Sequence, residues 1–183
     1  MKRDIGFVTK YMMEYDVVVP LYVVGGLAAI VLVIIFILFH FKKNNLSFIK
    51  NTAWCLLAAY VFLALCATVM FREEASEMRY SFRLFRCYSV VYYKMMAENI
   101  LNILFFVPIG FLMGFAKKEK NLLQILCIGC FISVSIEAIQ LATKRGVCNI
   151  DDVFHNSLGC VIGYGLYQLS YRIISKYCLQ KQS

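Results

Sequence analysis

The chain has 183 residues, of which 61% are hydrophobic and only 16% charged, with a mean hydropathy of +0.70 and a formal net charge of +8. A soluble domain is about half apolar and about a quarter charged, so this chain has too few charged residues to cover a water-exposed surface. The composition leaves no room for a separate soluble domain of ordinary size. Nucleic acid is not an expected partner, because no soluble basic module is present; the basic charge suits a membrane face against anionic lipid.

Five stretches that are almost free of charged residues follow one another along the chain, at residues 17–41, 51–71, 99–116, 122–143 and 153–171. A helix needs roughly 20 mostly apolar residues to cross a bilayer. The first stretch is too long for the hydrophobic part of a signal peptide, so we expect it to be retained. The sequence therefore predicts an all-α, polytopic integral membrane protein with about five transmembrane helices.

Basic residues in the connections predict the orientation. The connections after the first and third stretches and the C-terminal tail hold Lys42, Lys43, Lys50, Lys117, Lys118, Lys120, Arg172, Lys176 and Lys181. Alternating spans place all of these on one side, which the positive-inside rule makes cytoplasmic. The N-terminus is then outside and the C-terminus cytoplasmic, although the opposite side carries as many basic residues, mixed with acids.

Polar residues within the predicted spans concentrate at one end of three of them. They are Asn99 and Asn102 in the third, Ser133, Glu137 and Gln140 in the fourth, and Asp151, Asp152, His155 and Asn156 at the start of the fifth. Helical spacing places Ser133, Glu137 and Gln140 on one stripe, and it places Asp152 and Asn156 on another. We expect these ends to line one cavity that opens to the outer face.

Small residues continue these stripes deeper into the membrane. Gly159 follows Asn156 after three residues and Gly163 follows Gly159 after four, and Gly110 lies in the third span. Small residues at such spacing allow helix backbones to approach closely. Pro108 removes one backbone hydrogen bond from the third span and predicts a kink toward Gly110.

Glu137 is the strongest single candidate for a functional residue within the predicted spans. It lies about 10 Å of helix rise inward from Lys144, where a charge is costly unless it is paired, hydrated or neutralised. One interpretation is a packing glutamate bonded to Asn102 or Gln140. The other, which we favour, is a carboxylate that binds a ligand or transfers a proton, because ionisable groups within the membrane are functional by default.

The residues around the start of the fifth span admit simpler explanations. One of Asp151 and Asp152 is expected to cap the helix, which contributes about 1 kcal/mol or less. Asn156 is harder to explain in this way, because it begins to enter lipid depth. His155 is expected to be an interfacial histidine, since a lone histidine near carboxylates is weak evidence for a metal. No metal or cofactor is predicted.

The connection at 72–98 interleaves aromatic residues with arginines: Tyr80, Phe82, Phe85, Tyr88, Tyr92 and Tyr93 with Arg79, Arg83 and Arg86. One interpretation is a belt of interfacial aromatics with snorkelling arginines. The other is a lid whose guanidinium groups hold a phosphate or carboxylate. Cys87 and Cys148 fall on this same side, and whether they form a disulfide is left open.

Two sequence patterns together resemble the VanZ-like membrane proteins. The first is the run at 99–110, which reads Asn-Ile-Leu-Asn-Ile-Leu-Phe-Phe-Val-Pro-Ile-Gly. The second is Glu137-x-x-Gln140, then Arg145, then Asp152-x-x-x-Asn156 and Gly159. The resemblance covers about 71–171. We divide the chain into an N-terminal segment with the first span and a basic cytoplasmic loop (1–50), a VanZ-like transmembrane domain (51–175) and a cytoplasmic tail (176–183).

The resemblance implies a protein of the bacterial cytoplasmic membrane. The family's namesake is associated with resistance to teicoplanin-type glycopeptide antibiotics. Two hypotheses follow. In the first, the protein binds an amphiphile at the outer face, either a lipoglycopeptide or a lipid-linked cell-wall precursor. Its ligand-binding residues would be Asn102, Gln140, Arg145, Asp152 and Asn156, with Arg145 holding an anionic headgroup.

In the second hypothesis, the protein is an enzyme that acts on a lipid-linked substrate, with Glu137 as general base. Asp152 and Asn156 would then hold a substrate hydroxyl or a divalent cation. We rank binding first, because no nucleophile is identifiable. Pro108, Gly110, Gly159 and Gly163 have structural roles in both hypotheses, and the oligomeric state is left open.

Overall fold

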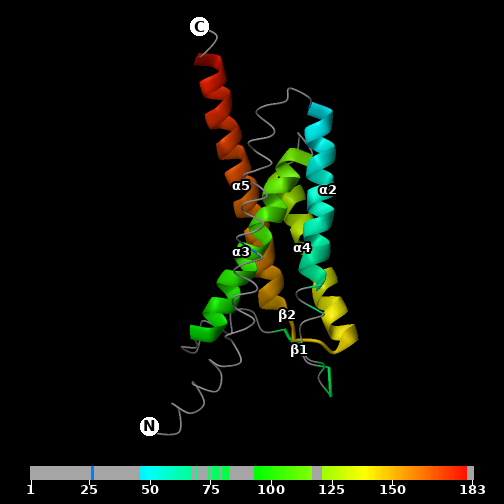
Figure 1. Ribbon diagram of the computed structural model, residues 1–183. Helices are drawn as coiled ribbons and strands as arrows, with labels where there is room; N and C mark the ends of the chain where they lie inside the picture. Colours follow the sequence, from blue (N-terminus) through cyan, green and yellow to red (C-terminus); the bar gives the residue numbers. More distant parts are fainter. Residues whose placement is uncertain are drawn as a thin grey trace.

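The computed structural model describes residues 26, 46–66, 69, 74, 76–78, 80–82, 93–116 and 121–180. In chain order the described elements are α2 (Leu46–Leu65), β1 (Tyr80–Ser81), α3 (Tyr93–Ala116), α4 (Leu122–Thr143), β2 (Cys148–Asn149) and α5 (Ile150–Gln180) (Figure 1). Apart from Gly26, the predicted first span at 17–41 lies outside the described residues.

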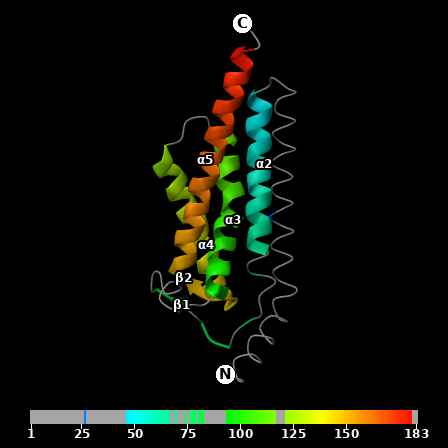
Figure 2. The same cartoon turned by 90° about the vertical axis from the view of Figure 1, so that its left-hand side faces the viewer.

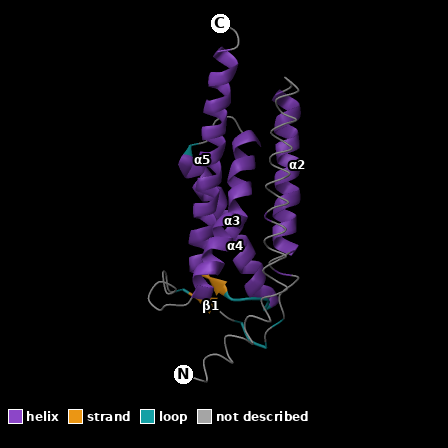
Figure 3. Cartoon of the chain, turned by 60° about the vertical axis from the view of Figure 1, so that its left-hand side comes forward, coloured by secondary structure: helices purple, strands orange, loops and turns teal. Residues whose placement is uncertain are grey.

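The four helices run side by side along one long axis (Figure 2). α3 and α5 run in one direction, whereas α2 and α4 run in the other (Figure 1). The start of α3, the end of α4 and the start of α5 therefore lie at one end of the bundle. The strand pair β1–β2 lies at that same end, opposite the C-terminal end of α5 (Figure 3).

Among the described residues, three helical segments are long and apolar enough to cross a membrane: Ser47–Leu65, Glu98–Ala116 and Leu122–Thr143. α5 has 31 residues and is long enough, but polar and charged residues at both of its ends lower its apolar content. The structure thus confirms a helical protein with membrane-length helices, and it does not confirm the predicted number of five.

The outer surfaces of these helices are rich in large apolar side chains. Phe62, Leu63 and Phe131 are 66%, 60% and 74% exposed, which suits contact with lipid rather than water. Hydroxyl groups on the same surfaces are satisfied within their own helices: Ser135 donates to the Phe131 carbonyl at 2.8 Å, and Thr143 donates to the Ile139 carbonyl at 2.7 Å. These hydroxyl groups therefore need no hydrogen-bond partner from outside the helix.

α3 and α5 cross in direct backbone contact (Figure 1). A Cβ atom placed on Gly110 of α3 would collide with the backbone carbonyl of Cys160 on α5. A Cβ on Gly163 of α5 would collide with the carbonyl of Val107 on α3, and Gly159 meets another α3 carbonyl in the same way. Only glycine permits this approach, which is the packing that small residues allow between membrane helices.

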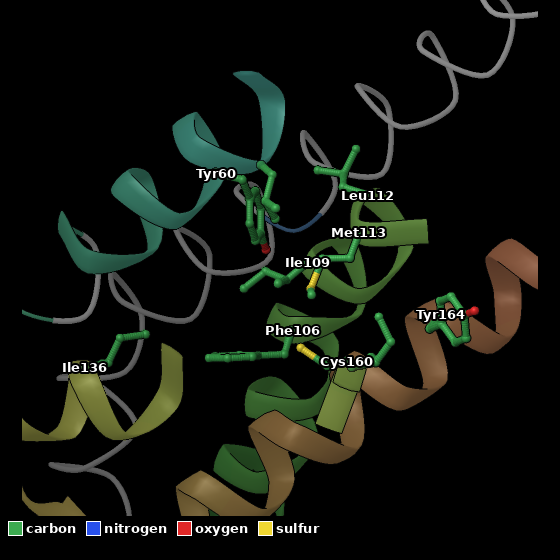
Figure 4. Packing of buried hydrophobic residues seen from close by; sticks show 10 residues of the cluster. Tyr60, Phe106, Ile109, Leu112, Met113, Ile136, Cys160 and Tyr164 are labelled. Carbon is green, nitrogen blue, oxygen red and sulfur yellow. The ribbon is translucent and has the colours of Figure 1, made fainter. Parts of the chain in front are cut away.

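The buried core joins α2, α3, α4 and α5 around the middle of α3. Phe106 points from α3 toward Ile136 of α4, and Cys160 of α5 lies beside it (Figure 4). Ile109 and Met113 extend the same cluster along α3, and both are buried. Large side chains of α3 thus fill the space between α2, α4 and α5. The glycines of α3 instead allow close contact with α5.

Pro108 is buried in the middle of α3. Because proline has no N–H, the helix loses one backbone hydrogen bond there. The neighbouring α2 contacts α3 one turn before this proline, where the Tyr60 hydroxyl donates to the Phe105 carbonyl at 2.8 Å. The two rings also pack against each other, with centroids 5.7 Å apart. This contact holds α2 against the part of α3 that contains Pro108.

Candidate functional site

α4 ends in a tight reversal that brings the following chain back toward the helix. Lys144 adopts the left-handed conformation, with φ 56°, and its N–H bonds to the carbonyls of Gln140 and Leu141. The Arg145 N–H also donates to the Gln140 carbonyl, at 2.9 Å. Gly146 has φ 112°, a conformation that side chains rarely adopt. This reversal places β2 beside the last turns of α4.

Glu137 lies under β2. Its carboxylate Oε2 accepts a hydrogen bond of 2.8 Å from the backbone N–H of Asn149, and the residue is only 4% exposed. A bond between an ionised carboxylate and a backbone N–H is among the stronger hydrogen bonds in proteins. The acid is therefore held by the chain that connects α4 to α5, as well as by its place on α4.

Asn149 also forms the cap of α5. Its Oδ1 accepts a hydrogen bond of 3.2 Å from the Asp151 N–H, and its Nδ2 donates to Asp152 Oδ1 at 3.1 Å. This reciprocal arrangement satisfies one of the free N–H groups at the helix start. The prediction that one of the two aspartates caps this helix is wrong, because Asn149 takes that role and Asp152 supports it.

Two more polar contacts join α4 and α5 further along the helices. Asn156 Nδ2 donates to the Ser133 hydroxyl at 2.8 Å, and Ser157 Oγ lies 3.1 Å from Cys130 Sγ. Asn156 is only 5% exposed, and its Oδ1 has no hydrogen-bond donor in the described part of the chain. A buried polar atom of this kind is costly, so Asn156 Oδ1 is a place that can accept a further donor.

Asp151 and His155 are buried one helical turn apart on α5, each less than 3% exposed. His155 Nδ1 lies 2.6 Å from the Asp151 carbonyl oxygen, and because a carbonyl only accepts, this contact assigns a proton to Nδ1. Within the described residues, His, Cys, Asp and Glu side chains form no group of three that could hold a metal ion.

The other predicted site residues lie around this cluster. Gln140 is buried one turn beyond Glu137, and Arg145 is partly exposed in the reversal. Asn102 is partly exposed on α3. The structure therefore brings together Glu137, Asp152 and Asn156 through α4, β2 and α5.

β1 lies next to this cluster because it pairs with β2. It pairs in parallel with β2, with Tyr80 opposite Cys148 and Ser81 opposite Asn149. Cys148 is a free thiol whose pKa is raised, first by burial and then by the negative charges of Glu137 and Asp152. The predicted loop arginines Arg79, Arg83 and Arg86, and also Cys87, lie outside the described residues.

Sequence reasoning missed Asn149, which holds both Glu137 and the start of α5. The signal was present, because an asparagine three residues before an acid is a helix-capping pattern. Sequence reasoning placed Ser133 on the right stripe but did not name it as a site residue. Chemically, the cluster offers carboxylate and amide oxygens that accept hydrogen bonds, and it places them where helices α4 and α5 meet.

Comparisons with known proteins agree with this picture. The family model described as VanZ/LLP1 matches residues 26–171, and therefore begins well before the motifs that the sequence shares with VanZ-like proteins. Protein VanZ of Enterococcus faecium is 34% identical over 73 residues, which cover 40% of this chain and 45% of that protein. The match therefore spans less than half of that relative. No solved structure matches. Because the family match covers most of its length, the chain belongs to the VanZ/LLP1 family.

Proposed function

We propose that this protein lies in the bacterial cytoplasmic membrane and binds the polar part of an amphiphilic ligand at the cluster around Glu137. The ligand would be a lipoglycopeptide or a lipid-linked cell-wall precursor at the outer face. Binding of either would reduce susceptibility to teicoplanin-type glycopeptide antibiotics. The similarity to Protein VanZ supports a role in the bacterial membrane and in glycopeptide resistance. The polar cluster around Glu137 supports the position of the ligand site.

The observation that carries this proposal is the buried Glu137 carboxylate together with the open acceptor on Asn156. Glu137 is 4% exposed and held by the Asn149 N–H, and Asn156 Oδ1 lacks a donor among the described residues. Both are costly features for a bilayer-depth helix contact unless they serve a purpose. A ligand hydroxyl or amide group that donates to these oxygens would offset that cost.

The proposal includes five spans, with the N-terminus outside and the C-terminus in the cytoplasm. Three membrane-length helices and the alternating directions of α2 to α5 support it. Cys148 tests the orientation because it lies at the same end as Glu137. We expect a membrane-impermeant maleimide to label Cys148 from outside whole cells, in a variant whose other cysteines are replaced. Labelling only after the cells are opened would invert the orientation.

Susceptibility measurements test the biological role. Deleting the gene in its host should increase susceptibility to teicoplanin, and restoring the gene should reverse the change. Vancomycin is measured in parallel to show whether the effect depends on the lipid tail of the antibiotic. If susceptibility to both antibiotics is unchanged, the resistance role is wrong for this protein.

The burial of Glu137 also supports a second candidate function. In it, the protein is a membrane enzyme that modifies a lipid-linked substrate, with Glu137 as general base. Glu137→Gln separates the two, because it keeps the size and most hydrogen bonds but removes ionisation. If Glu137 is a general base, the variant should lose nearly all function at normal expression. If Glu137 only binds a ligand, the variant should lose much less. Glu77→Gln is the matched control, since Glu77 is exposed and lies in the connection before β1.

A further inference from the structure

The connection that carries β1 exposes large apolar side chains at the end of the helix bundle. Met78, Tyr80 and Phe82 are 56%, 66% and 67% exposed. β1, to which Tyr80 belongs, lies at the end of the bundle where α4 ends and α5 begins (Figures 1 and 3). Apolar side chains that are exposed to water in this way promote aggregation, so we expect another surface to cover them.

The strand geometry separates two faces of this segment. Side chains alternate along a strand, so Tyr80 and Phe82 share one face and Ser81 lies on the other. The two aromatic rings support this, because their centroids are 5.4 Å apart. Ser81 is only partly exposed and pairs with Asn149. One face of the segment is therefore aromatic and exposed, and the edge of β1 pairs with β2, the chain that holds Glu137.

The bilayer interface is the partner that fits the aromatic face. Tyrosine and phenylalanine place apolar rings at the level of lipid headgroups, where helices of membrane length end. The apolar surface also continues onto the bundle, because Val147 and Phe154 are 38% and 44% exposed beside β2 and on the first turns of α5. Glu74 and Glu77, which precede Met78, are exposed acids and mark where the segment returns to water.

We propose that Met78, Tyr80 and Phe82 insert into the headgroup region of the bilayer and form an interfacial anchor for β1. Through the Ser81–Asn149 pairing, this anchor holds Asn149 in position to bond to Glu137. The lipid surface thus contributes to the geometry of the buried acid. The inference depends on the membrane position of the helices and not on the identity of a ligand, nor on which side of the membrane faces outward.

Tryptophan fluorescence tests the insertion directly. The chain has a single tryptophan, Trp54 on α2, so Trp54→Phe gives a dark background. The double variant Trp54→Phe/Phe82→Trp is then reconstituted in lipid nanodiscs of phosphatidylcholine. We expect blue-shifted emission, strong quenching by lipids brominated near the headgroup, weaker quenching by lipids brominated near the chain end, and little quenching by aqueous iodide. Glu77→Trp is the control and should show red-shifted, iodide-quenched emission.

Water-like emission and full iodide quenching at position 82 would overturn the proposal. Tyr80→Trp is a second variant on the same face, which keeps the test decisive if the first does not fold. Coupling to the acid is measured through Cys148, whose thiol responds to the charge of Glu137. Tyr80→Ser with Phe82→Ser should change the pH dependence of Cys148 alkylation in nanodiscs, whereas Glu77→Ser should not. An unchanged profile in the double variant would refute the coupling.

Discussion

The backbone N–H of Asn149 donates a hydrogen bond of 2.8 Å to Oε2 of Glu137. This bond joins the connection before α5 to the buried half of α4. Because Asn149 also caps α5 through Asp151 and Asp152, one residue couples the start of one helix to the acid of another. A change that moves Asn149 should therefore affect Glu137.

Cys148 reports the charge of Glu137. Its pKa is raised by burial and by the charges of Glu137 and Asp152, and only the thiolate reacts with alkylating reagents. Glu137→Gln removes one of the charges that disfavour the thiolate, so the pKa of Cys148 should fall. Alkylation at pH 7 to 8 should then become faster and its pH profile should move to lower pH, in a variant without other cysteines.

The matched control for this measurement is Glu77→Gln, which removes an exposed carboxylate from the preceding connection. The profile of Cys148 should stay where it is in that variant. A slower reaction in Glu137→Gln, or equal shifts in both variants, would contradict the proximity of Cys148 and an ionised Glu137.

Two glycines of α5 should respond in opposite ways to alanine. Gly163→Ala places a Cβ against the Val107 carbonyl, and such overpacking costs about 1–3 kcal/mol. Gly165→Ala meets nothing within 4 Å, and alanine favours a helix over glycine by about 1 kcal/mol. Thermal unfolding in detergent should show a lower midpoint for Gly163→Ala and an equal or higher one for Gly165→Ala. Equal losses would show that the α3–α5 crossing is not this close.

Tyr60→Phe should destabilise the contact between α2 and α3. The variant keeps the ring but loses the hydroxyl that donates to the Phe105 carbonyl of α3. Hydrogen bonds between membrane helices contribute about 0.6 kcal/mol on average. Tyr171→Phe makes the same change at an exposed residue near the end of α5 and should have no measurable effect. Chemical denaturation of both variants distinguishes this bond from a general loss of hydroxyl groups.

Ser133 and Asn156 should be coupled. Ser133→Ala leaves the Asn156 amide without its partner in the buried contact, which costs about 1–3 kcal/mol. In an Asn156→Leu background the same serine change should cost little, because no buried amide remains to be satisfied. A double-mutant cycle on the free energy of unfolding measures the difference. Additive effects would show that the two side chains do not bond.

Much of the site could be located from helical spacing. A period of 3.6 residues placed Ser133, Glu137 and Gln140 on one face of α4 and predicted that the polar ends of three helices share one side. The helix directions in the structure agree with this arrangement (Figure 1). Spacing could not show what bonds to Glu137, because Asn149 lies in a connection without helical or strand periodicity.

The sequence by itself determined the membrane-length apolar helices and the family, since both depend on composition and on motifs along the chain. Only the tertiary structure decided the partner of Glu137 and the pairing of Ser81 with Asn149. These depend on the left-handed Lys144 and on Gly146, whose φ angles turn the chain back onto α4. A sequence pattern specifies which faces are polar, but the path of a short reversal decides which polar groups meet.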